Sequence, residues 1–357
     1  MSETQENLAV ERRDALWELL LAWYAAHRRD LPWRRVEDPY AVWVSESMLQ
    51  QTRVSTVIPY YERFIERFPT VQALAESGID EVLGLWSGLG YYSRARRLHA
   101  AAVMIVDEHQ GVFPRSRPEA EALPGVGAYT AGAVLSIAYG LEERLIDGNV
   151  QRVLARWFAV EGVVTKAGPR RFIEQMAGEL VDGVGDPGSW NQALMELGAT
   201  VCLPREPHCD RCPVRAACDA RARGMESALP ELAPKPAPIE VELEVFVVMD
   251  QGRVLLMRRS EEGRMAGLWE LPTREIGLEE PRLFPFELEA HLLRGAEIGF
   301  IKHSITKHRI QARVLSADLG ERELPEGWAW VSSSELEGLG LTGMTLKALK
   351  KARASLR

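Results

Sequence analysis

The first two thirds of the chain place apolar residues at helical spacing. Residues 11–27 predict an amphipathic helix, because four large apolar side chains recur on one face, namely Leu16, Leu19, Leu20 and Trp23. A second helix is expected to begin after Asp38, an N-cap residue followed by the proline favoured in a first turn, and to run to about Gln51. Further helical stretches follow, separated by glycines and prolines, and no strand pattern occurs before residue 240. Residues 1–223 are therefore predicted to form an all-α domain.

The spacing of apolar residues changes from helical to strand-like after a proline-rich segment. Residues 224–240 favour an extended, semi-rigid linker. Beyond it, stretches with strand character are expected at 241–249, 253–257, 299–316 and 328–331. The first two flank Asp250-Gln251-Gly252, which is typical of a hairpin turn. Residues 241–357 are therefore predicted to form a separate α+β domain, which makes the chain a multidomain protein.

Composition narrows the function classes. The 357 residues are enough for two domains, each with its own core. No apolar run is long enough to span a membrane, and the first residues are acidic and polar where a signal peptide would be basic and apolar, so a cytoplasmic protein without a membrane partner is expected. The net charge is −8, and acidic residues outnumber basic ones on both sides of the linker. Any contact with nucleic acid must therefore be local.

All four cysteines lie in one short segment, as Cys202, Cys209, Cys212 and Cys218. This grouping is no disulfide framework for a chain of this length, and it predicts one ligand cluster. Zinc and a [4Fe–4S] cluster both accept four cysteines, and the spacing alone favours neither. Four buried cysteines without a ligand are the structural alternative. The cationic side chains among them either contact phosphate or balance the charge of the centre, and they are Arg205, His208, Arg211 and Arg215.

A glycine-rich turn lies between two helical stretches, the second at 128–139. It consists of Leu123, Pro124, Gly125, Val126 and Gly127. Glycines let the backbone turn tightly and approach a ligand, and the following helix N-terminus offers free N–H groups to an anion. The segment therefore predicts a phosphate cradle that needs no charged side chain. A plain helix–helix turn would have the same pattern.

Together these motifs resemble a known family. LPGVGAYTAGA at 123–133, LIDGNV at 145–150 and the cysteine cluster are similar to the helix-hairpin-helix glycosylases of the endonuclease III superfamily. WVSESMLQQT at 43–52 and WSGLGYYSRARRL at 86–98 narrow the resemblance to the MutY family of adenine DNA glycosylases. The resemblance covers about residues 12–222. It implies an all-α glycosylase domain with one [4Fe–4S] cluster rather than zinc, followed by a Nudix-like domain.

The same resemblance implies a function in base excision repair. Such an enzyme removes adenine that is mispaired with 8-oxoguanine or guanine in double-stranded DNA. A monomeric, bacterial-type enzyme associated with the nucleoid in the cytoplasm is expected. A non-catalytic iron–sulfur DNA-binding module is an alternative from another class, and it would keep its function when the catalytic carboxyl group is removed.

Two carboxyl groups are the candidates for the chemistry, Glu46 and Asp147. Cleavage of an N-glycosidic bond requires protonation of the leaving base and stabilisation of an oxocarbenium ion, as in O-glycoside hydrolysis. Glu46 lies among apolar residues, which raises a carboxyl pKa and suits a proton donor, whereas Asp147 is expected to stay ionised beside the sugar. By resemblance, Tyr129 and Asn149 bond these carboxylates. The structural alternatives are a helix-surface acid for Glu46 and a turn former or helix cap for Asp147.

The lysine content decides between two mechanisms. A glycosylase–lyase forms a Schiff base through a lysine amine. In endonuclease III this lysine follows the hairpin, and Tyr129 stands at that place here. Lys166 is the only lysine in residues 1–223 and lies outside every motif. A monofunctional enzyme that leaves an abasic site is therefore predicted, and the alternative is a glycosylase–lyase for oxidised pyrimidines.

Base excision requires the adenine to leave the duplex. By resemblance, Gln51 and Tyr91 wedge into the base stack near 8-oxoguanine, and Leu49 lines the base pocket. A tyrosine buried in the core is the structural alternative for Tyr91. Six further positions are expected at the pocket, namely Arg29, Leu31, Trp33, Val54, Gln192 and Met195.

The C-terminal region contains GLWELP at 267–272, which resembles the strand before a Nudix box. The acidic box itself does not follow, so no pyrophosphohydrolase activity is expected, and this opposes a Nudix-type nucleotide hydrolase. By resemblance, Ser304, Thr306 and Lys307 form the loop that contacts 8-oxoguanine, with His303 and His308 beside it. Lys307 stands where the family usually has histidine, and it donates hydrogen bonds as a stronger point charge. A simple β-hairpin rim is the alternative.

Overall fold

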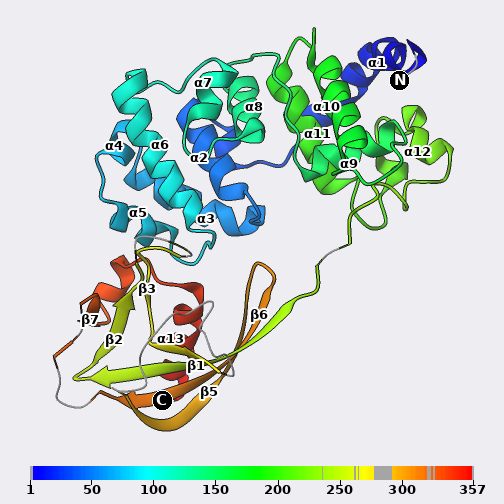
Figure 1. The fold of residues 1–357 in the computed structure, drawn as a ribbon. Helices are drawn as coiled ribbons and strands as arrows, with labels where there is room; N and C mark the ends of the chain where they lie inside the picture. Colours follow the sequence, from blue (N-terminus) through cyan, green and yellow to red (C-terminus); the bar gives the residue numbers. More distant parts are fainter. Residues whose placement is uncertain are drawn as a thin grey trace. The chain divides into compact units, whose positions relative to one another are not determined.

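The computed structural model describes residues 3–234, 236–260, 263, 265–276, 292–319, 323–324 and 326–355, with the side chains of 13–354 within these ranges. The chain divides into two compact units (Figure 1). Unit 1 consists of residues 1–72 and 100–234, and unit 2 consists of residues 73–99 and 235–357. Residues 73–99 thus group with the C-terminal region, although they lie within the helical part of the sequence.

The described part of unit 1 is helical, apart from one isolated bridge between Val163 and Glu231. Its elements are α1 (Glu3–His27), η1 (Pro32–Arg34), α2 (Pro39–Leu49), α3 (Val54–Arg67), α4 (Val71–Ala75, at the unit boundary), the later part of α6 (Ser93–His109), α7 (Arg117–Ala122), α8 (Ala128–Ile137), α9 (Gly148–Trp157), α10 (Ala167–Val181), α11 (Pro187–Thr200), η2 (Cys209–Arg211), η3 (Arg215–Ala217) and α12 (Asp219–Ala222). A hydrophobic core joins α1 with α8–α11 and the cysteine segment. No described helix is both long and apolar enough to cross a bilayer.

The predicted N-cap of the second helix is confirmed, whereas the predicted start and apolar face of the first helix differ from the structure. Asp38 caps α2 as predicted, because its carboxylate accepts a hydrogen bond from the Tyr40 N–H at 3.0 Å. Helix α1 begins at Glu3 rather than at residue 11. Its buried stripe includes Leu16, Leu20 and Tyr24, whereas Leu19 is 47% exposed. The prediction for Leu19 was wrong, because the i, i+4, i+8 row of the helix faces the core.

Unit 2 combines a mixed sheet with helices. Its elements are α5 (Ile79–Trp86), the start of α6, β1 (Ile239–Asp250), β2 (Arg253–Arg258), β3 (Trp269–Glu270), β4 (Thr273–Glu275), β5 (Leu293–Ile305), β6 (His308–Asp318), β7 (Trp328–Val331), η4 (Glu335–Gly338) and α13 (Gly343–Ser355). The sheet order is β3-β2-β1-β6-β5, with β4 paired to β1 and β7 to β2. Strands β1 and β6 are parallel, and β5 and β6 are antiparallel. Helix α13 packs on the face whose core includes Leu243, Val245 and Ile310.

The two hairpin turns of unit 2 follow from local backbone preferences. Gln251 and Gly252 both have positive φ, as a two-residue turn between right-handedly twisted strands requires, so the predicted β1–β2 hairpin is confirmed. The stretch predicted as strand at 299–316 consists of two strands. The chain reverses at Thr306 and Lys307, between Ile305 and its partner His308.

Candidate active site

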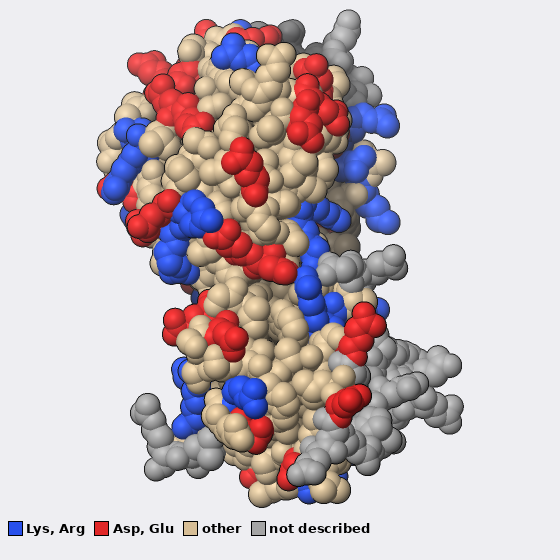
Figure 2. Space-filling model, turned by 90° about the vertical axis from the view of Figure 1, so that its left-hand side faces the viewer, with Lys and Arg blue, Asp and Glu red and all other residues tan. Residues whose placement is uncertain are grey.

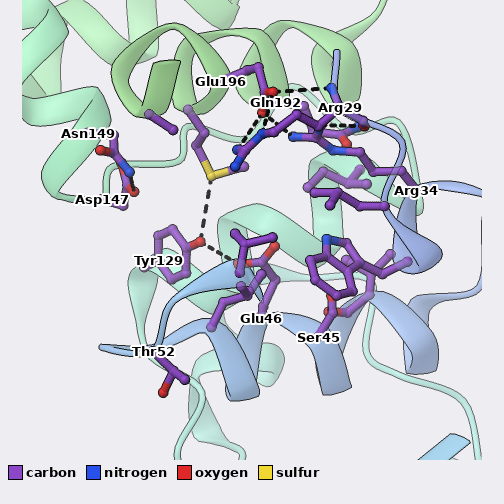
Figure 3. A pocket seen from close by; sticks show the side chains of 18 residues that line it. Arg29, Arg34, Ser45, Glu46, Thr52, Tyr129, Asp147, Asn149, Gln192 and Glu196 are labelled. Atoms are coloured by element: carbon purple, nitrogen blue, oxygen red, sulfur yellow. Dashed lines mark hydrogen bonds and ion pairs between the residues drawn. The ribbon is translucent and has the colours of Figure 1, made fainter. Parts of the chain in front are cut away.

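A pocket of about 190 Å³ opens within unit 1 between α2, α8, α11 and the start of α9 (Figure 3). It contains both predicted carboxylates, Glu46 and Asp147. Nine other predicted residues also line it, namely Arg29, Leu31, Trp33, Leu49, Val54, Tyr129, Asn149, Gln192 and Met195. Seven lining residues lie outside the sequence-based set, namely Arg34, Val42, Ser45, Thr52, Ile137, Glu196 and Ala199.

Glu46 projects into the pocket from α2 and is 4% exposed. The Tyr129 hydroxyl donates a hydrogen bond to its carboxylate and lies 3.6 Å from the Met195 sulfur. Burial raises the pKa of Glu46 from 4.5 to about 7, while the Tyr129 hydrogen bond opposes the rise and the charge of Asp147 adds to it. Glu46 can therefore hold and release a proton near neutral pH, and it is not a helix-surface acid.

Asp147 is both a helix cap and a pocket residue. As the N-cap of α9, its carboxylate accepts hydrogen bonds from the Val150 N–H at 2.7 Å and from the Asn149 side-chain amide at 2.8 Å. Burial raises the pKa of Asp147, although both donors favour the ionised form and oppose the rise. The cap thus fixes the direction of this carboxylate from two sides.

A chain of hydrogen bonds leads from Asp147 to the cysteine segment. The Asn149 side-chain amide donates to Asp147. The buried Arg152 donates to the side-chain amide oxygen (Oδ1) of Asn149 at 2.8 Å and to the backbone carbonyl of Cys202 at 2.8 Å. Gly198 on α11 lies directly behind Asn149, where a Cβ atom would be 2.5 Å from the Asn149 Cβ. The carboxylate at the pocket is therefore oriented by groups outside it.

Glu196 is the main residue that the sequence reasoning missed. It is fully buried at the pocket, where Arg29 donates two side-chain hydrogen bonds to it at 2.7 and 2.8 Å and Arg34 donates one at 2.9 Å. These arginines outweigh burial and hold the pKa of Glu196 below its ordinary value. Glu196 follows the predicted Gln192 by four residues, so helical periodicity was the available signal for placing both on one face.

The predicted hairpin is formed by α7, a tight turn and α8. Gly125 has a φ of 80°, a conformation that favours glycine. Leu123 and Val126 are buried and hold the turn to the core, whereas Gly125 and Gly127 are exposed. Gly127 is the N-cap of α8 and supplies no side chain. No side chain of this residue therefore caps the first N–H groups of α8. Such N–H groups at a helix N-terminus can bind an anion.

The four cysteines line one common cavity together with Arg156 and Trp157. Arg156 is 1% exposed and donates to the Cys202 sulfur at 3.2 Å and to the Leu203 carbonyl at 2.7 Å. Burial raises the pKa of Cys212 to about 12. Among the residues that the structure describes, no three His, Cys, Asp or Glu side chains form a single-ion site. The four thiols are nevertheless brought together, and a buried guanidinium faces them, which fits a centre of negative charge.

The remaining predicted residues lie outside the pocket. Gln51 is exposed, with a φ of 57°, just after α2. Tyr91 belongs to unit 2 and is 47% exposed. Ser304, Thr306 and Lys307 are exposed at the β5–β6 turn. His308, beside this turn, is buried, and one of its ring nitrogens lies 3.3 Å from the Ile305 carbonyl.

Comparisons with known proteins agree with this architecture. Residues 44–178 match the HhH-GPD superfamily of base excision DNA repair proteins, and residues 244–351 match the NUDIX domain. The human adenine DNA glycosylase is 35% identical over 93% of this chain and 72% of its own length, and that of Schizosaccharomyces pombe is 32% identical over 97% and 90%. The solved structure of a thermostable thymine-DNA glycosylase is 28% identical, with a TM-score of 0.55, over 60% of this chain and 98% of its own.

These matches confirm the predicted fold class. A helix-hairpin-helix glycosylase domain is followed by a Nudix-like domain with a sheet. The human and Schizosaccharomyces pombe relatives align with 93% and 97% of this chain, and both are named adenine DNA glycosylases. The chain belongs to the adenine DNA glycosylase family.

Proposed function

We propose that this DNA glycosylase hydrolyses the N-glycosidic bond of adenine opposite 8-oxoguanine or guanine and leaves an abasic site. The observation that carries the proposal is that Glu46 and Asp147 line one pocket of about 190 Å³, which has room for one purine base. Their surroundings differ. Glu46 titrates near neutral pH, and Asp147 accepts two hydrogen bonds that favour its charge. These are the two roles that the reaction needs.

In the proposed mechanism, Glu46 donates its proton to the ring nitrogen of the extruded adenine as the bond to the sugar breaks. The electron pair of that bond leaves with the base, and the sugar becomes an oxocarbenium ion. Asp147, ionised and held by Asn149, stabilises this cation. Water then adds its hydroxide to the sugar carbon, and its proton returns to the Glu46 carboxylate. Tyr129 holds Glu46 in place and is the donor that lowers its pKa.

The pocket walls support adenine as the leaving base. Leu31, Trp33 and Val54 supply apolar surface for a flat ring. At one end, the buried Glu196 carboxylate holds Arg29 and Arg34, and the remaining N–H groups of these arginines are donors for ring nitrogens. Adenine has several such nitrogens on its edges.

The pocket supports a monofunctional reaction. The residues that line it include no lysine, and Tyr129 occupies the first turn of α8. Lys166 is exposed at the start of α10. Borohydride should therefore trap no efficient covalent adduct with DNA. An adduct that survives replacement of Lys166 and depends on another residue would contradict this part of the proposal.

For DNA contact we propose the hairpin at Leu123–Gly127, the exposed residues Gln51 and Tyr91, and the turn with Ser304, Thr306 and Lys307. On the face drawn in Figure 2, acidic and basic side chains are interspersed. On a surface of mixed charge, we expect DNA to be bound by local backbone donors and by side chains that stack on bases, rather than by a broad basic patch.

For the cysteine cavity we propose one [4Fe–4S] cluster held by Cys202, Cys209, Cys212 and Cys218. Bound there, the cluster would cross-link the end of the helical unit. Replacing Cys212 with serine should abolish the visible absorbance of the purified protein and lower its melting temperature. Purified protein that is colourless and contains one zinc ion would overturn the assignment.

Strand cleavage after alkali tests the function directly. Duplexes with adenine opposite 8-oxoguanine, guanine or thymine are incubated with the wild type and with Glu46→Gln. The wild type should produce alkali-labile sites mainly opposite 8-oxoguanine, and Glu46→Gln should be slower by about 100-fold or more, because it cannot donate the proton. Equal cleavage by both proteins would contradict the catalytic assignment, and no cleavage of any duplex by the wild type would contradict the function.

A further inference from the structure

The loop between α5 and α6, residues 87–92, has a backbone held in an unusual conformation. Gly88, Gly90 and Tyr91 have φ values of 93°, 79° and 49°. Tyr91 is the one non-glycine residue among them, and a left-handed conformation is unfavourable for a residue with a side chain. Tyr91 is nevertheless 47% exposed, so its own burial does not account for this conformation. Contacts of the surrounding loop must hold it.

Part of this support comes from helices α5 and α6. The Trp86 indole N–H donates to the Gly90 carbonyl at 3.1 Å, and an Arg94 guanidinium nitrogen donates to the same carbonyl at 3.0 Å. The Arg94 guanidinium also lies 5.4 Å from the Trp86 ring centroid and 5.5 Å from that of Tyr91. The exposed ring therefore lies against a buried cation that is itself fixed.

The other part comes from the Nudix-like region of the same compact unit. The Tyr92 hydroxyl accepts a hydrogen bond from the Gly88 N–H at 3.0 Å and donates one to the Leu341 carbonyl at 2.7 Å. The Ser87 hydroxyl accepts a hydrogen bond from the Leu341 N–H at 3.3 Å. The loop is thus bound to both backbone groups of Leu341.

Leu341 is a firm point of attachment. It is 3% exposed and forms a parallel bridge with Trp269 of β3. The Trp269 N–H donates to the Gly340 carbonyl at 2.9 Å. At Gly340 an added Cβ would be 2.8 Å from the Leu83 Cβ of α5, so the two segments pack without space between them. The position of the loop is therefore set by the core of the Nudix-like region.

We infer that Tyr92 is a positioning residue through which the Nudix-like region holds the Tyr91 loop in its DNA-contacting conformation. The inference rests on the proposed contact of Tyr91 with DNA. Tyr92 itself is buried. It acts by joining Gly88 to Leu341, so that the C-terminal region influences mismatch recognition from a place other than its own exposed turn.

Binding to a duplex that cannot be cleaved tests the inference. The probe carries 2′-fluoro-2′-deoxyadenosine opposite 8-oxoguanine, and dissociation constants are measured for the wild type, Tyr91→Ala, Tyr92→Phe and the double variant. Tyr92→Phe should weaken binding about fivefold to tenfold through loss of two hydrogen bonds. The double variant should bind little more weakly than Tyr91→Ala, because both substitutions act on the same contact between Tyr91 and DNA. Tyr40→Phe is the matched control, since it removes a buried hydroxyl that donates to the Phe68 carbonyl.

The outcomes separate this inference from the proposed function. If Tyr91→Ala weakens binding but Tyr92→Phe does not, or if the two losses add in full, the inference is wrong and the contact of Tyr91 with DNA stands. If Tyr91→Ala binds like the wild type, the proposed contact itself is wrong. If Tyr92→Phe folds poorly, Ser87→Ala replaces it in the test, because it removes the other side-chain hydrogen bond to Leu341. Ser87→Ala should then weaken binding in the wild type but have no further effect when combined with Tyr91→Ala.

Discussion

The hydroxyl of Tyr129, in the first turn of α8, donates a hydrogen bond to the carboxylate of Glu46 in α2. Two opposing effects therefore act on one carboxyl group, because burial raises its pKa and this donor lowers it. Burial also raises the pKa of Tyr129 well above its ordinary value, so the hydroxyl keeps its proton at neutral pH. The pair holds the pKa of Glu46 at about 7, where the group can act as an acid and then as a base.

Replacing Tyr129 with phenylalanine should shift the pH profile of excision. Loss of the donor leaves burial unopposed, so the pKa of Glu46 should rise above about 7 and the fall in rate should move to higher pH. Single-turnover rates between pH 5 and pH 9 measure the shift. A profile that keeps its midpoint, or moves to lower pH, would show that Tyr129 does not control this proton.

The variant Glu46→Gln should be more stable than the wild type above neutral pH. The folded pKa of Glu46 is raised from 4.5 to about 7, so the wild type loses stability as pH rises through this window, while the unfolded chain ionises first. The difference in free energy of unfolding should reach about 3 kcal/mol above pH 7 and vanish below about pH 4.5. Urea unfolding at several pH values measures it. A difference independent of pH would contradict the assigned pKa.

Replacing Arg152 with glutamine should slow excision although Arg152 does not line the pocket. The change removes the donor that orients Asn149 and frees the Cys202 carbonyl, so Asp147 should lose its fixed direction. We expect a rate about 10- to 100-fold lower, since small displacements of a catalytic group have effects of this size. Arg170→Gln is the control, because Arg170 lies exposed on α10. Equal rates for both variants would show that the hydrogen-bond chain has no role.

Replacing Glu196 with glutamine should weaken the binding of the base more than it changes the pH profile. Arg29 and Arg34 would lose a fully buried anionic partner, so these donors for the ring nitrogens of adenine would lose their fixed positions. A KM for A:8-oxoguanine duplex raised about tenfold is expected, which corresponds to the loss of one hydrogen bond to a charged group. An unchanged KM would rule out this end of the pocket as the contact for adenine.

The sequence alone determined the features that depend on neighbours along the chain. The Asp38 cap, the turn at Gly125 and the hairpin at Gln251 each follow from the backbone preferences of a few adjacent residues. The cysteines share one cavity because they lie in one short segment. Glu46 and Asp147 could be named in advance because each lies within a motif of the family that the chain resembles, and the structure places both at one pocket.

Only the tertiary structure decided which distant residues meet. Glu196 reaches Arg29 across 167 positions, and Ser87 reaches Leu341 across 254, and no local period encodes such pairs. The same applies to residues 73–99, which are helical by pattern but pack with the sheet. The pKa of Glu46 is a further case, since burial sets it and burial is a property of the assembled core. Helical spacing defines which side chains share a face, whereas the three-dimensional packing determines what that face meets.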